Sequence, residues 1–419
     1  MVIFAMINKR KVAGAVLAAV LSTAGLVACS SDSSSSSSGG SASASGPVTL
    51  TVWTSQEDQT DDNAWLQTME AKFKEANPDL DVTFKNSVVS SADAGTTVNQ
   101  DPSAAADVYY YANDQLGSLL DAGAVGQLSD SGIAQLKEQD SATMADSVKG
   151  TDGESYGLPV EPNTWFMYYN KSKLSAEDVK SFDTMLSKAK VSFPLSNSWY
   201  LPAFYAGAGA TFFGSDGLDE SAGIDLGSKA ADVTKYLVDV SKNPNFVNDA
   251  DGSGMGGLAN GAVDVVFSGA WDSKAAQEAL GANYGVAALP TFKLDGQDVQ
   301  MKAFSGSKAI GYNPNTSNPQ VAAQFAEFLA STDSQKIHFQ KTGVIPADQT
   351  LADDPEISAD PVATALFEVV GSDSILQPTF NAMSDFWDPA ENFGKAITNG
   401  EVTADNAADK TAAWASSYK

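Results

Sequence analysis

The chain has 419 residues, 43% of them hydrophobic and 18% charged, which is enough for two or three globular domains with large cores. Its 52 Asp and Glu residues outnumber the 25 Lys and Arg residues, and the net charge of −27 argues against nucleic acid as a partner. One Cys and one His exclude an internal disulfide and a thiolate or His-rich metal site, and we expect no cofactor.

The N-terminus has the pattern of an export signal. Lys9, Arg10 and Lys11 precede an apolar stretch, 12–27, that is short for a membrane span, so we predict a signal peptide over residues 1–28. The stretch ends in Leu26-Val27-Ala28-Cys29, which resembles the lipobox of bacterial lipoproteins. The resemblance implies that Cys29 becomes the lipidated N-terminus of the mature chain. The alternative is an ordinary signal peptide with an incidental Cys.

The segment that follows is almost entirely Ser, Gly and Ala. Such a composition cannot bury apolar surface, so residues 29–46 are predicted to be a flexible tether with an r.m.s. span of about 20–25 Å. A globular body behind it would stay close to a membrane and still be free to turn.

The first part of the globular region alternates strands and helices. Alternating apolar residues predict a strand at 48–52, and the spacing of Trp65, Met69 and Phe73 predicts a helix that Asn77 ends. Strands at 80–84 and 108–111 and a helix at 113–121 follow, with Gly123 as its C-cap. This order predicts an α/β fold with a mostly parallel sheet.

The second part is less regular. We predict helices at 175–190, 201–213, 228–240 and 321–339, and strands at 263–267, 284–289 and 310–312. The spacing GxGxxG at 252–257 has no apolar strand before it and acidic neighbours, which favours a flexible loop over a nucleotide site. His338 is predicted to be a surface or half-buried helix residue.

Large aromatic residues gather at the predicted strand ends and turns. Flat rings at such edges can stack on the C–H face of a pyranose, while neighbouring polar side chains bind its hydroxyls. Any one ring can equally be a core residue, but the group as a whole favours a sugar site. The group comprises Tyr109, Tyr110, Tyr111, Trp165, Phe166, Tyr168, Tyr169, Trp199, Tyr200, Trp271 and Trp387.

Several short segments give the chain a resemblance to the family-1 extracellular solute-binding proteins of ABC sugar importers, and most of all to the maltose- and maltodextrin-binding proteins. The resemblance covers almost the whole mature chain. Each segment is weakly specific alone, but their order and spacing are characteristic. They are Leu50-Thr51-Val52-Trp53, Ala106-Asp107-Val108 with Asn113-Asp114, Gly157-Leu158-Pro159-Val160, Tyr169-Asn170-Lys171, Gly269-Ala270-Trp271, 283–292 and 383–387.

The resemblance implies an α/β fold of the two-lobed periplasmic-binding-protein type (type II), in which each lobe is a mixed, mostly parallel sheet flanked by helices. Lobe 1 would comprise 47–161 and 310–352, and lobe 2 would comprise 162–309 and 353–419. The chain would cross between lobes near 159–165, 303–312 and 351–356. The ligand would lie in the inter-lobe cleft, on which the lobes close.

The resemblance also implies the site residues. The ring-stacking positions are Tyr111 in the first lobe and Trp271 and Trp387 in the second, with a further ring at Trp199 or Tyr200. The polar positions are Glu57, Asp58, Asp114, Asn163 and Asp388.

The chain departs from the maltose binders of the family where they carry cations. Gln115 and Glu391 stand at Arg positions, Asp58 at a Lys position and Asp388 at a Tyr position. The stacking frame is kept while cationic donors are lost, so a neutral oligosaccharide related to maltose is expected. An anionic sugar is disfavoured because Asp58, Asp114, Asp388 and Glu391 would repel it.

The expected function is therefore that of a monomeric, lipid-anchored binding protein, with no catalytic step, on the outer face of the cytoplasmic membrane. It would capture a neutral di- or oligosaccharide and deliver it to the transmembrane subunits of an ABC permease. A secreted glycoside hydrolase that uses an Asp/Glu pair is the first alternative. A two-lobed receptor for a peptide or a polyamine is the second.

Overall fold

The computed structural model describes residues 46–60 and 64–418. The predicted signal peptide, Cys29 and nearly all of the predicted tether lie outside the described residues. Of the helices in the described ranges, none has both the length and the apolar composition that a membrane crossing requires.

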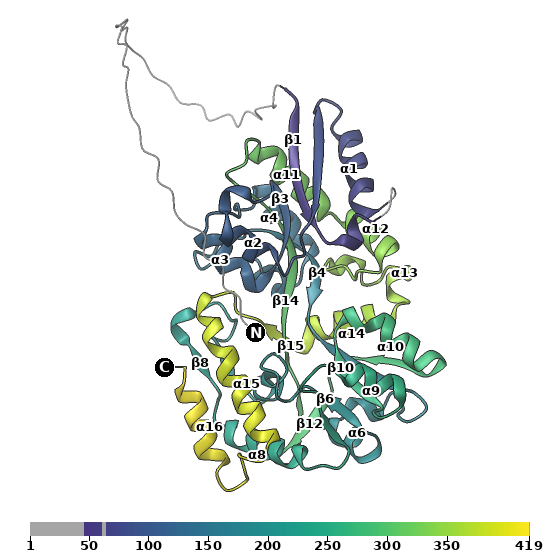
Figure 1. The fold of residues 1–419 in the computed structure, drawn as a ribbon, viewed down its shortest axis with the longest axis vertical. Coiled ribbons are helices and arrows are strands. Elements are labelled where there is room, and N and C mark those ends of the chain that lie inside the picture. Colours follow the sequence, from purple (N-terminus) through teal and green to yellow (C-terminus); the bar gives the residue numbers. More distant parts are fainter. Residues whose placement is uncertain (1–45, 61–63, 419) are drawn as a thin grey trace, which may run out of the picture. The chain divides into compact units, whose positions relative to one another are not determined.

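Six strands form the first sheet, in the order β15-β14-β3-β1-β2 with β4 also paired to β14 (Figure 1). β1 pairs parallel to β2 and β3, whereas β14 pairs antiparallel to β3 and β4 and parallel to β15. The alternation of strand and helix that predicted a parallel sheet is thus confirmed for the first three strands. The strands are β1 (Val48–Thr54), β2 (Val82–Val88), β3 (Val108–Ala112), β4 (Leu158–Asn163), β14 (Ala303–Tyr312) and β15 (Ser374–Leu376).

Five strands form the second sheet, in the order β11-β5-β10-β6-β9. They are β5 (Phe166–Asn170), β6 (Val191–Phe193), β9 (Phe246–Asn248), β10 (Val265–Ser268) and β11 (Tyr284–Ala287). Two hairpins accompany this sheet, namely β7 (Thr211–Phe212) with β8 (Ile224–Asp225), and β12 (Thr291–Leu294) with β13 (Gln297–Gln300).

Helices flank both sheets, and the chain belongs to the α/β class. The helices in the parts of the chain that form the first sheet are α1 (Trp65–Ala76), α2 (Ala94–Gln100), α3 (Leu116–Asp121), α4 (Asp130–Gln139), α5 (Ala142–Asp146), α11 (Pro319–Leu329) and α12 (Thr332–Thr342). The others are α6 (Phe182–Lys188), α7 (Pro202–Gly207), α8 (Ala230–Ser241), α9 (Gly254–Asn260), α10 (Ser273–Leu280), α13 (Pro355–Ser358), α14 (Pro361–Ser372), α15 (Ser384–Thr398) and α16 (Ala407–Ser416).

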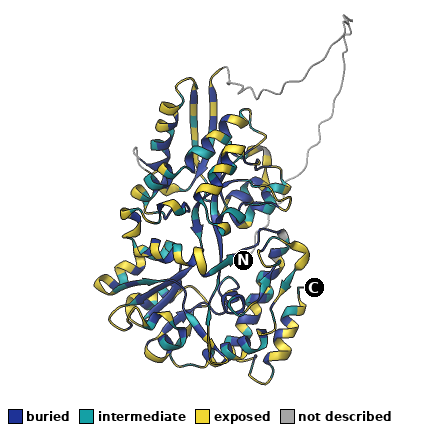
Figure 2. Cartoon of the chain, turned by 180° about the vertical axis from the view of Figure 1, so that it is seen from behind, coloured by how far each residue is buried: buried dark blue, intermediate teal, exposed yellow. Residues whose placement is uncertain are grey.

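Each sheet has its own hydrophobic core, one in each lobe. The first core is built from residues of 48–160 and 309–330, and the second from residues of 165–304 and 345–414. Figure 2 shows the buried residues concentrated in the strands and on the inner faces of the helices. A strand covered on both faces buries every residue, which is why Val108, Tyr109, Tyr110 and Tyr111 are all buried in β3.

The long strand β14 belongs to both lobes. Ala303, Phe304 and Ser305 pair with β15, and the rest of the strand pairs with β4 and β3. Phe304 is part of the second core, whereas Ile310 is part of the first. From the sequence a strand was predicted only over its last three residues, because Ser305, Gly306, Ser307 and Lys308 give no apolar alternation.

Some predicted helices were wrong in extent. The helix predicted over 321–339 is two helices, because Ser331 caps α12 and its Oγ accepts a hydrogen bond from the Ser334 N–H. Of the helix predicted over 201–213 only α7 forms, and 211–212 is a strand. The loop predicted at the GxGxxG spacing was also wrong, since Gly254 begins α9 and its N–H binds the Asp249 carboxylate.

Candidate functional site

Trp271 is the exposed ring of the predicted group. It lies in a short 3₁₀ helix, Ala270–Asp272, directly after the central strand β10, and 57% of the residue is exposed. Its indole lies against Gly269, where an added Cβ would come within 2.0 Å of the ring. The absence of a side chain at Gly269 therefore creates the space in which the ring rests.

Trp199 backs this ring. The two ring centroids are 6.0 Å apart with an interplanar angle of 32°. A pyranose held between two parallel rings would need the planes about 7–8 Å apart, since each contact takes about 3.5–4.0 Å. The pair is too close for that arrangement, so a sugar would stack on the outer face of Trp271, with Trp199 as support.

Hydrogen bonds fix the turn that carries Trp271. The Tyr168 hydroxyl, fully buried on β5, donates to the Gly269 carbonyl at 2.8 Å. Ser268 donates to the Asp272 carboxylate at 2.5 Å across the same turn. The ring is thus mounted on a rigid strand end rather than on a mobile loop.

Trp387 lies in α15 and is partly buried against the second core. Its ring is 6.0 Å from that of Phe304 on β14 and 5.4 Å from that of Phe386. The structure therefore places Trp387 beside the strand that both lobes share. Asp388, the next residue, is exposed.

Asn163 and Asp114 lie at the crossing between lobes. Asn163 ends β4 and is paired with Gly306 of β14. An added Cβ at Gly306 would lie 2.0 Å from the Asn113 side chain, so Gly306 lets this amide pack on the strand. Asp114 follows in the 3₁₀ helix Asn113–Gln115 and is exposed.

The Asp114 carboxyl is open to solvent yet surrounded by protein. Desolvation raises its pKa above the usual value, and a hydrogen bond from its own backbone opposes the rise.

Glu57 lies in a separate hollow of the first lobe. The hollow, of about 490 Å³, is at the carboxyl ends of β1 and β2 and is lined by Ser55, Gln56, Glu57, Val88, Val89, Ser90, Asp93 and Thr97. Glu57 is exposed, and so is 56% of Val88. Carboxyl ends of parallel strands are the usual ligand edge of an open α/β sheet.

Three predicted site residues are not available to a ligand in this structure. Tyr111 is fully buried, because β3 is an interior strand covered on both faces, and its hydroxyl donates to the Tyr156 carbonyl. Burial raises the pKa of its phenol. Tyr200 is 8% exposed and packs on Trp165 with ring centroids 4.8 Å apart. Of the pair 199–200, Trp199 is therefore the residue that packs against the exposed ring of Trp271.

Asp58 is the third. It is 2% exposed and its Oδ1 lies 2.7 Å from Nε2 of His338, whose ring stacks on Trp65 at 4.3 Å. The prediction that His338 is a surface or half-buried residue was wrong, because its ring is buried between Asp58 and Trp65. Asp58 and His338 are a buried pair that fastens α12 to the start of the first lobe.

The predicted site residues did not include Gln377, which contacts Trp199, one of them, and Asn113, the neighbour of Asp114. Gln377 directly follows β15, and its side-chain oxygen accepts from the Trp199 indole at 2.9 Å. Its backbone oxygen accepts from the Asn113 side chain at 3.3 Å. A Gln in a Leu-Gln-Pro stretch has no signal of its own, and only the fold brings these residues together.

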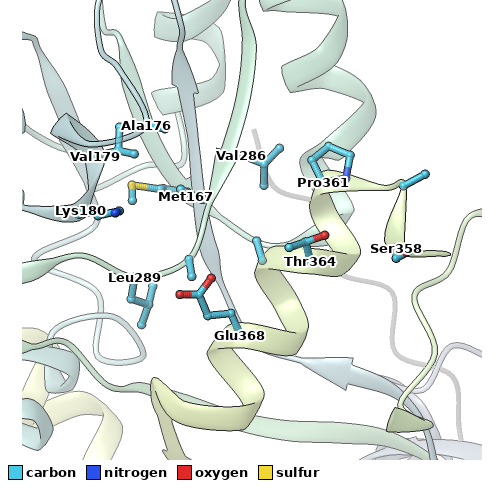
Figure 3. A pocket seen from close by; sticks show the side chains of 14 residues that line it. Met167, Ala176, Val179, Lys180, Val286, Leu289, Ser358, Pro361, Thr364 and Glu368 are labelled. Atoms are coloured by element: carbon cyan, nitrogen blue, oxygen red, sulfur yellow. The ribbon is translucent and has the colours of Figure 1, made fainter. Parts of the chain in front are cut away.

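A further pocket lies outside this group of residues. Figure 3 shows it beside the edge strand β11, with Met167, Val286 and Leu289 on one side and α14 on the other. Its volume is about 450 Å³, and Lys180 and Glu368 line it with opposite charges. None of the aromatic residues predicted to stack on sugar lines it.

Comparison with known proteins gives the family. A model of the bacterial extracellular solute-binding protein family matches residues 68–365. The chain is 28% identical over 321 residues to the maltooligosaccharide ABC transporter solute-binding lipoprotein of Streptococcus pneumoniae R6, which covers 72% of this chain and 74% of that protein. It is 26% identical to the galactooligosaccharide-binding protein of Bacillus subtilis, over 73% of this chain and 75% of that one.

Solved structures agree with the fold. One, described as being with acarbose, is 46% identical with a TM-score of 0.79 and covers 89% of this chain and 99% of that chain. The unliganded maltodextrin-binding protein MalE1 of L. casei BL23 is 29% identical with a TM-score of 0.82, over 88% and 98% of the two chains. The two-lobed periplasmic-binding-protein fold expected from the sequence is confirmed.

Proposed function

Because the chain belongs to the bacterial extracellular solute-binding protein family, we propose that it captures a neutral di- or oligosaccharide of the maltooligosaccharide type outside the cell. It then delivers this ligand to the permease of an ABC transporter. The observation that carries the proposal is the exposed Trp271 ring, mounted on a strand end and backed by Trp199. A flat apolar face of this kind matches the C–H face of a pyranose.

The polar part of the proposed site comes from both lobes. Asn163 and Asp114 lie at the crossing, and Asp388 follows Trp387 in the second lobe. These side chains offer acceptors and an amide for sugar hydroxyls. Micromolar affinity corresponds to about −8 kcal/mol, which requires such hydrogen bonds in addition to stacking.

The names of the relatives support the ligand class. Maltooligosaccharide, galactooligosaccharide and acarbose occur in them, and all are oligosaccharides or analogues of oligosaccharides. We also propose lobe 1 as 47–161 with 310–352 and lobe 2 as 162–309 with 353–419, where Ile345 and Leu351, near the last crossing, pack on the second core. We propose a monomer as the active form. Light scattering on the purified protein would test the monomer.

A sugar panel tests the function. The purified mature domain would be heated with maltose, maltotriose, maltotetraose, acarbose and a β-galactooligosaccharide, because a ligand that binds only the folded state raises the Tm. Titration calorimetry then gives Kd. Chromatography of the recovered sugars separates binding from hydrolysis: a binding protein returns its ligand intact, and shortened products would establish the glycoside hydrolase instead. A panel with no Tm shift would contradict the proposal.

The lipid anchor is a separate proposal. We propose that Cys29, the only Cys of the chain, is acylated and holds the protein at the outer face of the cytoplasmic membrane. Two or more acyl chains are needed for stable anchoring. In cells, Cys29→Ser is expected to move the protein from the membrane fraction to the medium, while Ser30→Ala leaves it in place. A Cys29→Ser protein that stays in the membrane fraction contradicts the anchor.

A further inference from the structure

Gln377 lies where three segments meet. Its backbone N–H donates to the Ser305 carbonyl of β14 at 2.8 Å, which continues the pairing of β15 by one residue. Its backbone carbonyl accepts from the Asn113 side chain of the first lobe, and its side-chain oxygen accepts from the indole of Trp199 in the second. Gln377 is 5% exposed.

The chemistry of the partners fixes the orientation of the amide. An indole N–H can only donate, so the Gln377 oxygen must face Trp199 and the amide nitrogen must point elsewhere. A side chain without an acceptor at this position would leave the partly buried indole N–H without this partner. The ring would then lose the contact that sets its angle.

The angle of Trp199 sets the place of Trp271. The two rings pack at 6.0 Å, and the Trp271 indole also lies against Gly269, on a turn that the Tyr168 hydroxyl holds. Asn113, at the other end of the bridge, is next to Asp114 at the crossing between lobes. Gln377 therefore contacts both the ring pair, through Trp199, and the first lobe, through Asn113.

We propose that Gln377 is a positioning residue for sugar binding: it holds the Trp199–Trp271 pair at the angle that a pyranose needs and ties this pair to the first lobe through Asn113. The inference rests on the proposed function. Gln377 acts through Trp199 and needs no contact with the sugar.

The test is a double-mutant cycle with maltotriose, or with the best ligand of the sugar panel, measured by calorimetry. Gln377→Met keeps the size of the side chain and removes the acceptor, and it is expected to weaken binding about tenfold. Gln377→Glu keeps the acceptor and is expected to bind within about threefold of the wild type. In a Trp199→Phe background, Gln377→Met should have almost no further effect.

A spectroscopic readout needs no ligand. The seven Trp residues give seven indole N–H signals in ¹H–¹⁵N spectra of the unliganded protein, and loss of one signal in Trp199→Phe assigns Trp199. Gln377→Met should shift that signal, whereas Gln377→Glu should retain its hydrogen-bonded position. Gln300→Met, which removes a Gln donor to the Leu289 carbonyl of the same lobe, is the matched control and should leave both the signal and the affinity unchanged.

The outcomes separate the two proposals. If the wild type binds no sugar of the panel, the proposed function fails, and the indole signal still shows whether Gln377 holds Trp199. If the wild type binds and Gln377→Met binds equally well, or if its effect and that of Trp199→Phe simply add, the positioning role is overturned. Loss of folding in Gln377→Met would show as loss of all dispersed indole signals. In that case the positioning role is tested by comparing Gln377→Glu with Gln377→Asp, whose side chain is too short to reach the indole. Equal affinities and equal Trp199 signals in these two variants would overturn the role.

Discussion

The indole of Trp271 rests on Gly269, and the space it fills is the one that any other residue at 269 would occupy. Gly269 has φ −101° and ψ −172°, an extended conformation that every residue can adopt. Residue 269 must therefore be glycine because the Trp271 ring occupies the space of a side chain, and not because of its backbone conformation. Substitution of Gly269 thus tests the position of the ring separately from the fold.

Gly269→Ala is expected to weaken oligosaccharide binding about tenfold, or about 1.4 kcal/mol, with little change in Tm, because the exposed ring can swing into solvent. Gly256→Ala is the control. It lies in α9 with nothing within 4 Å of an added Cβ, so it should leave affinity unchanged and stabilise the helix by about 0.5–1 kcal/mol. Calorimetry and thermal melts check both; equal affinities of the two variants would contradict the stacking role of Trp271.

Trp271→Ala should lower affinity by tens-fold or more and leave the Tm nearly unchanged, since the ring is exposed. Trp387→Ala should also lower affinity, but it removes a partly buried ring that packs on Phe304 and Phe386. We expect it to cost stability as well, below the roughly 3–5 kcal/mol of a fully buried Trp. Denaturant unfolding together with titration separates the two effects; wild-type affinity in folded Trp271→Ala would refute the sugar site.

Tyr168→Phe removes the hydroxyl that donates to the Gly269 carbonyl. The buried carbonyl then lacks this donor, so we expect a loss of about 1–3 kcal/mol of stability. The loosened turn should also weaken binding several-fold. Tyr205→Phe is matched, because it removes an equally buried hydroxyl that contacts Thr234, and it should reduce the Tm alone. If both variants bind like the wild type, the turn is not what holds the ring.

Asp58→Ala distinguishes a structural role from a ligand-binding one. The carboxylate lies 2.7 Å from His338 in the interior of the first lobe, so its loss should cost at least about 1.5–3 kcal/mol of stability. The affinity of the folded variant should change less than twofold. Glu57→Ala, one residue earlier and exposed, should show the reverse pattern. A large affinity loss in folded Asp58→Ala would restore it as a ligand residue.

Asp140 makes stability depend on pH. Both of its carboxylate oxygens are buried and, within the described residues, have no hydrogen-bond partner. Desolvation and then the nearby Asp348 raise its pKa well above the usual value. The folded state thus holds this proton more tightly than the unfolded state does, so stability falls as pH rises above the unfolded pKa of about 3.9.

Asp140→Asn should therefore raise the Tm at pH 7.5, where the free energy of unfolding should rise by at most about 1–3 kcal/mol. At pH 4 the effect should be smaller. Melts from pH 4 to 8 check this, with the exposed Asp239→Asn as the control that should show no such pH trend. An equal Tm change for Asp140→Asn at both pH values would contradict the raised pKa.

Residue type alone could not separate the rings of the site from those of the core. Tyr111 ends the predicted strand 108–111, and Trp271 follows the predicted strand 263–267, so both rings lie near strand ends in the sequence. The difference is that β3 is an interior strand with both faces covered, whereas Trp271 lies beyond the end of β10. The covering of β3 on both faces depends on how distant parts of the chain pack, which a single sequence does not contain.

The elements were predictable where apolar periodicity was strong. β1, α1 and α8 follow the predicted ranges closely. β14 was mostly missed because its middle is small and polar, and these residues are buried by the meeting of two sheets rather than by their own hydrophobicity. Gln377 gains its role in the same way, from partners 72 to 264 residues away along the chain, namely Ser305, Trp199 and Asn113. Gly306 gains its role from the Asn113 side chain.

β14 supplies one continuous backbone to two cores, and this has a consequence for cooperativity. Neither lobe can unfold without breaking backbone hydrogen bonds that β14 makes in the other lobe. Calorimetry should therefore record a single endotherm rather than two. By the same linkage, a sugar bound to the Trp271 face should slow amide exchange in β3, whose residues Val108 to Tyr111 are all buried in this structure.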